Sequence, residues 1–451
     1  MMQFELTKEI IREIKDNIAK QHQKAILEVL RDIHPADIAD IIDELNLEEA
    51  VYIFKIVDKE KKSDVLTELD EDSREKVLNA LSSKEIAEEI DDLETDDAAD
   101  IIAELTDDKK EEVISQIEDT DHAKDIVDLL RYPEDTAGGL MGKELVKVNE
   151  NWSMLRCVKE MRDQAQEIDI VHTVYVVDEE NVLKGILSLK SMLTTSTKTP
   201  VKEIYNDNII YVKTNEKDEE VAKIMQKYDL IVVPVVDELG HLVGKITIDD
   251  IVDVIKDEAD RDYQMAAGIS EDVEASDTIF KLTKARLPWL LIGMLGGLGA
   301  ATIINHFESG LKTYSSLIIF IPLIQATAGN VGVQSAAIMV QAIANNSLNN
   351  EIVKRLLKEL TLGLVNALAL ASIFLIISQV FFQTDLKIAL TIGVALSTVI
   401  ILAAIIGTFI PLFLHKRGVD PAVATGPFIT TSNDVFGILI YFIIAKLILG
   451  F

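Results

Sequence analysis

Asp434 lies near the middle of the last strongly apolar segment of the chain, within residues 430–437. A carboxylate at that depth in a membrane helix is costly, so it normally faces a bundle interior or a watery path and marks an ion route. No Cys or His lies nearby, which argues against zinc, copper or iron. Mg²⁺ keeps several waters while it touches one or two carboxylates. The alternative is a carboxylate satisfied by hydroxyls of neighbouring helices.

Small and polar residues gather in only two of the apolar segments, the second and the last. Glycines allow close backbone approach, amides offer oxygen ligands, and a Gly-Pro pair interrupts a helix, as broken helices that line cavities do. We therefore predict a pore lined by Gly329, Asn330, Gly332, Gln334, Gly426, Pro427, Thr430, Thr431 and Asn433. Small-residue helix packing explains the glycines without a pore, but it does not explain the clustering of the amides and hydroxyls.

A second group of carboxylates lies far away in the sequence, in residues 91–100. Six acidic residues occupy these ten positions without one basic residue, and Asp96 and Asp100 share a helical face. Such a surface either responds to cations or is an ordinary solvated acidic face, and the sequence leaves both readings open.

The positions of these groups reflect an uneven distribution of charge. The 451 residues carry 44 Lys+Arg and 76 Asp+Glu; residues 281–451 hold 11 and 6 of them, which leaves 33 and 70 for residues 1–280. The first part is thus at −37 and the second at +5, for a total of −32. Such an acidic first part repels nucleic acid and attracts cations.

The lone Cys157 excludes an intramolecular disulfide and fits a reducing compartment.

Five apolar stretches are long enough to cross a bilayer. They cover residues 285–307, 314–344, 360–382, 386–414 and 422–449. Three clusters of Lys and Arg fall on one side of the resulting topology, the side that carries the acidic half. We therefore expect a multi-pass protein of the plasma membrane with a cytoplasmic N-terminus, an external C-terminus and no cleaved signal peptide.

Two internal repeats organise residues 1–256. A sequence motif at residues 37–45 is repeated at residues 97–105 and more weakly at residues 122–130. This repetition predicts an irregular all-α superhelix over residues 1–131. A second duplication, offset by 59 residues, resembles a pair of α/β CBS domains, here 132–200 and 201–256, modules that often sense adenine nucleotides. The ribose-contacting hydroxyl–x–x–Asp pattern of that family matches Thr247 and Asp250 in the second copy, whereas the first copy has Ser188 and Ser191.

The order of these parts resembles the MgtE family of magnesium channels and transporters. An acidic helix begins near residue 249 and connects through residues 257–280 to the membrane part, residues 281–451. The resemblance is carried by residues 132–141 (YPEDTAGGLM), 329–335 (GNVGVQS), 420–422 (DPA) and 433–437 (NDVFG). It covers nearly the whole chain.

The resemblance implies a homodimer with one central pore, in which Asp434 from each chain holds hydrated Mg²⁺ and Asp420 lies nearer the cytoplasmic end. It also implies regulatory Mg²⁺ sites between the cytoplasmic domains and the connecting "plug" helix. The matching residues are Asp96, Asp97, Asp100, Glu219, Asp229, Asp249, Asp250, Asp253, Glu258 and Asp262. Arg261 stands where the family has a carboxylate. An adenine nucleotide such as ATP is the expected ligand of the CBS pair.

We predict that cytoplasmic Mg²⁺ bound between these domains closes the pore. Two other readings stay open: an ion-coupled carrier of divalent cations such as Co²⁺ or Mn²⁺, and a membrane-anchored CBS sensor without transport. An enzyme is not expected, because the sequence shows no nucleophile–base pair, no phosphate-cradling glycine loop and no His/Cys metal cluster.

Overall fold

A computed structural model describes the chain except for residues 1–3, 167, 169, 272, 276, 345–351 and 425. It divides into two compact units, Met1–Ile255 and Lys256–Phe451. We describe each unit by itself.

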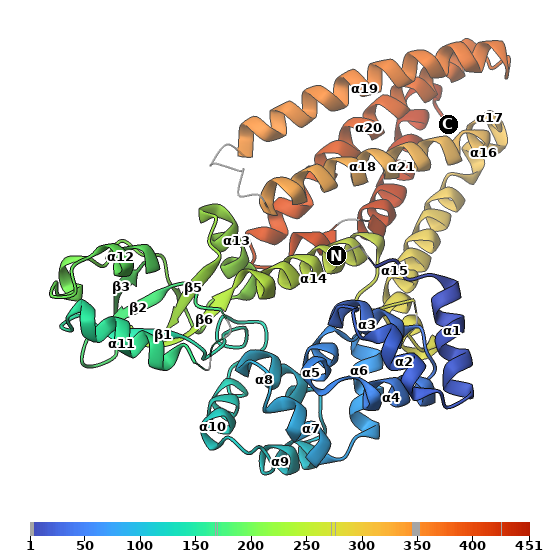
Figure 1. Cartoon of the computed structure of the whole chain (residues 1–451). Helices are drawn as coiled ribbons and strands as arrows, with labels where there is room; N and C mark the ends of the chain where they lie inside the picture. Colours follow the sequence, from blue (N-terminus) through green and yellow to red (C-terminus); the bar gives the residue numbers. More distant parts are fainter. Residues whose placement is uncertain are drawn as a thin grey trace. The chain divides into compact units, whose positions relative to one another are not determined.

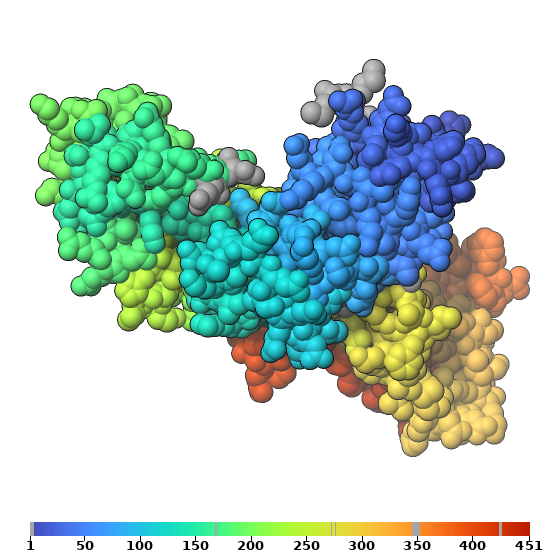
Figure 2. Space-filling view, turned by 60° about the horizontal axis from the view of Figure 1, so that its bottom comes forward, coloured from blue at the N-terminus to red at the C-terminus, as the bar shows by residue number. Residues whose placement is uncertain are grey.

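The first unit begins with short helices that pack side by side as a superhelix (Figure 1), and Figure 2 shows the outer surface of these residues in blue. Apolar residues recur at helical spacing, and Ile38, Ile41, Ile42, Ile53 and Phe54 form part of its buried core. The helices are α1 (Lys8–Ala19), α2 (Gln23–Leu30), α3 (Pro35–Asp43), α4 (Leu47–Ile56), α5 (Lys59–Glu68), α6 (Glu71–Ala80), α7 (Ser83–Ile90), α8 (Thr95–Ala103), α9 (Asp107–Ile114) and α10 (Thr120–Leu129). The three copies of the repeated sequence motif lie largely in α3, α8 and α10.

Side-chain caps define where several of these helices begin. Asn46 with Glu49 and Ser82 with Glu85 form complete capping boxes at the starts of α4 and α7. In each box the side-chain oxygen of the first residue accepts the N–H of the second, whose carboxylate accepts in return. Reciprocal capping fixes the first turns of these two helices, of ten and eight residues, so the chain can change direction sharply just before each of them.

The same unit continues into two small sheets of identical topology. Each has one parallel and one antiparallel pair, in the orders β1-β2-β3 and β4-β5-β6, as the duplication requires. The elements are β1 (Val146–Asn149), α11 (Met154–Gln164), β2 (Val174–Val177), β3 (Leu183–Leu187), α12 (Leu189–Thr194), η1 (Val201–Glu203), β4 (Val212–Lys213), α13 (Asp218–Tyr228), β5 (Val232–Val236) and β6 (Leu242–Thr247).

Helix α14 (Ile248–Ala267) follows β6 without a loop and continues past the boundary between the two units. Its first turn carries Asp249 and Asp250. The connecting helix therefore starts inside the second CBS copy, as a direct continuation of its last strand.

The second unit is helical, with α15 (Ile279–His306), α16 (Glu308–Thr313), α17 (Ser316–Ile319), α18 (Ile321–Ala344), α19 (Ile352–Val380), α20 (Leu386–His415), η2 (Pro421–Ala424) and α21 (Gly426–Leu449). Five segments have the length and composition of membrane spans. Helix α20 lies at the centre: α18, α19 and α21 all pack along it, and α15 packs on α21 (Figure 1). Two of the spans begin before the ranges expected from hydropathy, since α15 starts at Ile279 and α19 at Ile352, whereas α21 starts at Gly426, inside its expected range of 422–449.

Candidate functional site

Acidic residues from three separate parts of the chain line one cavity in the first unit. The cavity has a volume of about 360 Å³ and lies between the start of α8 and the start of α14. Its acidic lining residues are Glu68, Glu94, Asp96, Asp97, Asp249, Asp250 and Asp253. Five of these are predicted regulatory residues, two of them on α8 and three on α14, and the two groups are about 150 positions apart in the sequence. A single Lys245 accompanies them.

Hydrogen bonds to Glu144 fix the start of α8 against the loop that precedes β1. The Thr95 N–H donates to Glu144 Oε1 at 3.0 Å, and the Thr95 hydroxyl donates to Oε2 at 3.1 Å. The Lys143 N–H donates to the same hydroxyl at 2.9 Å. Nearby, Gly142 and Lys245 exchange backbone hydrogen bonds of 2.9 Å. The helix start is therefore tied to the CBS pair by both side-chain and backbone contacts.

Glu94, Asp96 and Glu144 form the tightest carboxylate group in the described part of the chain. One oxygen from each lies within 4.8 Å of the others, a spacing that a single cation can bridge. Gly142 makes room for the group, because a Cβ there would lie 2.8 Å from Asp96 Oδ2. Glu94 and Glu144 were not among the predicted ligands. The acidic run pointed to Glu94, but no local pattern marks Glu144, which only the fold brings close.

Burial and mutual repulsion raise the pKa values of these carboxyl groups. Burial, followed by the charge of Asp250, raises the pKa of Asp96 well above its usual value and that of Asp97 to about 7. Burial is also the main cause that raises the pKa of Asp250 to about 6, against the lowering effect of its hydrogen bonds to Thr247. The Asp97 side chain still reaches water, so screening moderates its repulsion. The cavity thus holds more negative charge than Lys245 balances, and a divalent cation would relieve this excess.

The remaining predicted regulatory residues lie outside the lining of this cavity. Asp100 is on the next turn of α8, where burial and Glu134 raise its pKa to about 6 while Arg74 opposes the shift. Glu219 pairs with Lys223 at 3.0 Å within α13. Asp229 is exposed at the left-handed C-cap of the same helix.

In the second unit, Glu258 pairs with Arg261 at 2.6 Å on α14, and Asp262 is exposed beside them. The basic Arg261 thus sits directly on one of the predicted ligands. The structure tests none of these residues as ligands, so their regulatory role stays a prediction.

Thr247 and Asp250 form a closed local contact at the start of α14. The Thr247 hydroxyl and N–H donate to the same oxygen of Asp250, at 2.7 and 3.0 Å. In the first copy, the hydroxyls of Ser188 and Ser191 lie 2.8 Å apart instead. Because Asp250 faces the acidic cavity, a triphosphate bound there would meet repulsion unless it carried its own cation.

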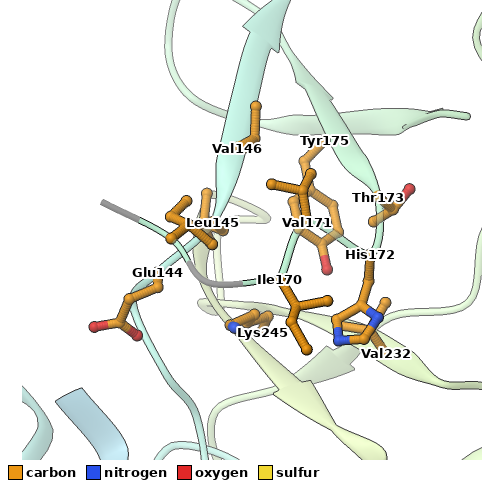
Figure 3. A pocket seen from close by; sticks show the side chains of 11 residues that line it. Glu144, Leu145, Val146, Ile170, Val171, His172, Thr173, Tyr175, Val232 and Lys245 are labelled. Atoms are coloured by element: carbon orange, nitrogen blue, oxygen red, sulfur yellow. The ribbon is translucent and has the colours of Figure 1, made fainter. Parts of the chain in front are cut away.

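A smaller pocket lies where the two CBS copies meet (Figure 3). Glu144, Tyr175 and Lys245 are among its lining residues, but its volume is only about 10 Å³. The Tyr175 hydroxyl is buried without a hydrogen-bond partner among the described residues. A space of this size holds about one water molecule, which would satisfy the hydroxyl, and it is too small for an adenine ring.

The second candidate site is the packing of α18 on α21 in the other unit. Asn433 is 2 % exposed, and its side-chain nitrogen donates to the Ala328 carbonyl at 3.3 Å. Gly332 permits this approach, because a Cβ at this position would collide with the Asn433 amide. Gly407 of α20 similarly contacts the Gly332 carbonyl. These glycines bring the two predicted pore helices together.

The polar residues of α18 divide between two faces. Gly329 and Gly332 are buried against α21, whereas Asn330 and Gln334, one turn apart, are exposed. Exposed amides on a membrane span are costly in lipid, so this face calls for water or a second protein surface. Asp434 is half-buried on α21, one residue after Asn433.

Other predicted pore residues have local roles in the described structure. The Thr430 hydroxyl donates to the Gly426 and Pro427 carbonyls at 3.2 and 3.0 Å. The Thr431 methyl group lies against Gly296 of α15, so this residue packs between helices. Exposed Asp420 accepts the Ala422 N–H at 2.8 Å and caps η2.

The end of α14 lies against the start of α21. Gly426 has a φ of +42°, and a Cβ there would collide with the Ala266 carbonyl; a Cβ on Gly268 would collide with the Pro427 ring. The two segments meet so closely that both positions require glycine. The connecting helix therefore ends on the Gly426–Pro427 break that the sequence marks as part of the pore.

Comparisons with known proteins cover each part of the chain. The MgtE family model, described as a divalent cation transporter, matches residues 321–444. The MgtE intracellular N domain matches residues 33–135, and CBS domains match 137–197 and 201–257.

Two curated relatives and one solved structure extend these matches. The magnesium transporter MgtE of Thermus thermophilus is 35% identical over 97% of this chain and 98% of its own length. That of Enterococcus faecalis is 37% identical over 74% and 73%. A crystal structure of the cytosolic domain of the Mg²⁺ channel MgtE in complex with ATP covers 54% of this chain and 99% of its own, with a TM-score of 0.50 and 34% identity.

A helical N-domain and a CBS pair joined to five candidate membrane spans define a multi-pass transporter with an N-terminal multidomain region. The chain belongs to the MgtE family of divalent cation transporters. The fold class and the family resemblance predicted from the sequence are both confirmed. The family is one of transporters and not of enzymes.

The raised carboxyl pKa values predict a pH-dependent stability for the first unit. Because the folded state holds protons that the unfolded chain releases near pH 4, stability is highest at low pH and falls as pH rises from about 4 through 7. We expect the unfolding temperature of the full chain to fall by at least about 2 °C between pH 4 and pH 7, which corresponds to a loss of roughly 1 kcal/mol in the free energy of unfolding for a domain of this size. Calorimetry in detergent with a chelator measures this change.

Asp97→Asn should flatten this pH dependence, because it removes one of the repelling groups. Asp107→Asn on α9, which is exposed and does not line the cavity, is the matched control. A slope that is the same in Asp97→Asn and in the wild type would contradict the assignment.

The close contact of α18 and α21 predicts that Gly332→Ala is destabilising. The added Cβ would meet Asn433 and lie 2.8 Å from Ile429 Cγ2, so we expect a loss of about 1–3 kcal/mol, as for other overpacked sites. Thermal unfolding of the second unit in detergent measures the loss. Gly297→Ala on α15, which has open space around it, should be neutral or slightly stabilising, because Ala favours a helix more than Gly does; equal effects of both changes would contradict the clash with Asn433.

Proposed function

We propose that the chain is a Mg²⁺ channel or transporter for magnesium uptake, closed by Mg²⁺ that binds to its acidic N-terminal unit. The magnesium transporters to which it is 35% and 37% identical support the choice of ion. The observation that carries the gating proposal is the cavity in which α8 and α14 present carboxylates to each other with one lysine among them.

The pore site is proposed at Asp434, with Asp420 toward the cytoplasmic end. Hydrated Mg²⁺ suits a wide site with few direct ligands, since the ion gives up its water reluctantly. Asn330 and Gln334 are exposed on α18 although amides are costly in lipid. We propose that this face meets a second copy of the chain, so that a homodimer encloses the pore and doubles the carboxylate.

Gating follows from the electrostatics of the acidic cavity. Without divalent cations, repulsion favours separation of the start of α8 from the start of α14; with Mg²⁺ bound, the two surfaces attract. Because α14 also ends against Gly426 and Pro427, its position bears on the entry of the pore helix. We propose that high cytoplasmic Mg²⁺ fixes α14 in a closed arrangement, with the N-terminus on the cytoplasmic side.

Several weak sites meet the energetic requirement of this gate. To shift a gate from 1:99 to 99:1 takes about 5.5 kcal/mol of differential binding. A site in the closed state at about ten times its dissociation constant supplies roughly 1.4 kcal/mol. About four sites therefore suffice, and the cavity offers enough carboxylates for more than one ion.

The CBS pair is proposed to bind an adenine nucleotide with a bound cation. The related cytosolic domain was solved with ATP, and Thr247 and Asp250 remain our candidate contacts. The two rival readings, an ion-coupled carrier and a sensor without transport, differ from a channel in measurable ways: a carrier saturates and gives no unitary currents, and a sensor gives no flux.

Asp434→Asn should abolish Mg²⁺ flux or reduce it at least about tenfold, because it removes the carboxylate that is proposed to hold the ion within the membrane span. Uptake into proteoliposomes with an internal Mg²⁺ dye measures this. Asp385→Asn, which retains an N-cap residue at the start of α20, makes the same chemical change outside a span and should leave flux intact. Full flux in Asp434→Asn would exclude the pore role.

The triple change Asp249→Asn, Asp250→Asn and Asp253→Asn should leave flux intact but shift the inhibitory Mg²⁺ concentration on the side of the N-terminal unit at least about tenfold upward. The charge-matched control replaces Asp107, Asp108 and Glu111 on exposed α9 by their amides. If both triples retain wild-type inhibition, the cavity is not the sensor.

A further inference from the structure

A groove separates two of the membrane helices. Helices α18 and α19 each pack along α20 but scarcely touch one another, so α20 forms the floor between them (Figure 1). Within this groove lies a cavity of about 330 Å³. Leu323 and Thr327 of α18, Leu370, Ile373 and Ile377 of α19, and Leu396 of α20 are among its lining residues.

The lining is apolar except for one hydroxyl. Its one hydroxyl, on Thr327, donates to the Leu323 carbonyl of its own helix at 2.7 Å. Phe320 packs edge-on against Phe374 and Phe382, with ring centroids 5.1 and 5.3 Å apart. Farther along the groove, a 3.4 Å hydrogen bond between Ser335 and Glu359 links the two helices. The cavity is therefore an apolar space between an aromatic cluster and a polar contact.

The mouth of the cavity is continuous with the outer surface of the spans. Ile373 is 52 % exposed and Ile377 is 41 % exposed, as expected for side chains that face lipid. Leu370 to Ile377 extend over about 10 Å of helix axis at 1.5 Å per residue. That depth fits within one leaflet of a bilayer core about 30 Å thick. One end of the cavity lies near the end of α19, which is expected to be close to a membrane surface, where the headgroup of a bound lipid would lie.

We propose that the acyl chain of a phospholipid occupies this cavity and acts as a wedge between α18 and α19. A flexible chain of methylenes matches an elongated space without polar groups, and it supplies the dispersion contacts that an empty void would lack. Since α18 carries Asn330 and Gln334, the bound chain supports the helix proposed to line the pore. The proposed lipid site requires only that these helices lie in a membrane, and it does not depend on which ion the protein transports.

Tryptophan fluorescence can distinguish a bound chain from ordinary boundary lipid. In a Trp152→Phe and Trp289→Phe background, one tryptophan is placed at Ile377, which lines the cavity, or at the adjacent Ile376, which is 66 % exposed and does not line it. The full-length protein is reconstituted in phosphatidylcholine brominated on its acyl chains and is then extracted into detergent.

In the bilayer, both tryptophans should be quenched at least about twofold. After extraction, Ile376→Trp should regain its fluorescence, whereas Ile377→Trp should keep at least about half of its quenching. Leu370→Phe, or as a second variant Leu323→Phe, narrows the cavity and should release the retained quenching at position 377 while the protein stays monodisperse.

Two results would overturn the proposal. Equal recovery of both tryptophans in detergent would mean that only exchangeable boundary lipid is present. Quenching of Ile376→Trp but not of Ile377→Trp in the bilayer would mean that protein, such as a second copy of the chain, covers the groove.

Discussion

Repulsion among carboxylates is the interaction on which the proposed behaviour of this protein depends. Burial, and after it the charges of neighbouring carboxylates, raises the pKa values of Asp96, Asp97 and Asp250, and Lys245 is the one lysine in the lining of the cavity. A fold usually avoids such a cluster, because it reduces stability at neutral pH. Its presence between the start of α8 and the start of α14 is explained if a bound cation completes it, because the contact is then favourable only when the cation is present.

Local contacts hold the cluster in place while leaving its charge uncompensated. Glu144 uses both oxygens on Thr95, and Lys245 makes a 3.1 Å ion pair with Glu94. These bonds position α8 against the CBS pair but do not neutralise Asp96 or Asp97. The scaffold and the charged surface are thus separate features, so the carboxylates can respond to cations without loss of the fold that presents them.

The membrane unit shows a related division between packing and function. Glycines at positions 332 and 407 let α18 approach α21 and α20, and this close packing fixes the orientation of α18. Asn330 and Gln334 are then directed outward and Asn433 inward. At the other end of α21, Gly426 admits the last turn of α14. Close glycine contacts therefore both orient the proposed pore face and join it to the connecting helix, and a rigid helix transmits displacement better than a flexible loop would.

The sequence alone determined the domain order, the five spans, the duplicated CBS topology and the family, because these follow from patterns of hydropathy and repetition along the chain. It also pointed to Asp434, since a charge among apolar residues is visible locally. It did not predict Glu144 as part of the acidic group or the packing of Thr431 against α15. Only the tertiary structure decided which acids share a cavity and which faces meet, because distances between residues 50 to 150 positions apart depend on how the helices and sheets pack.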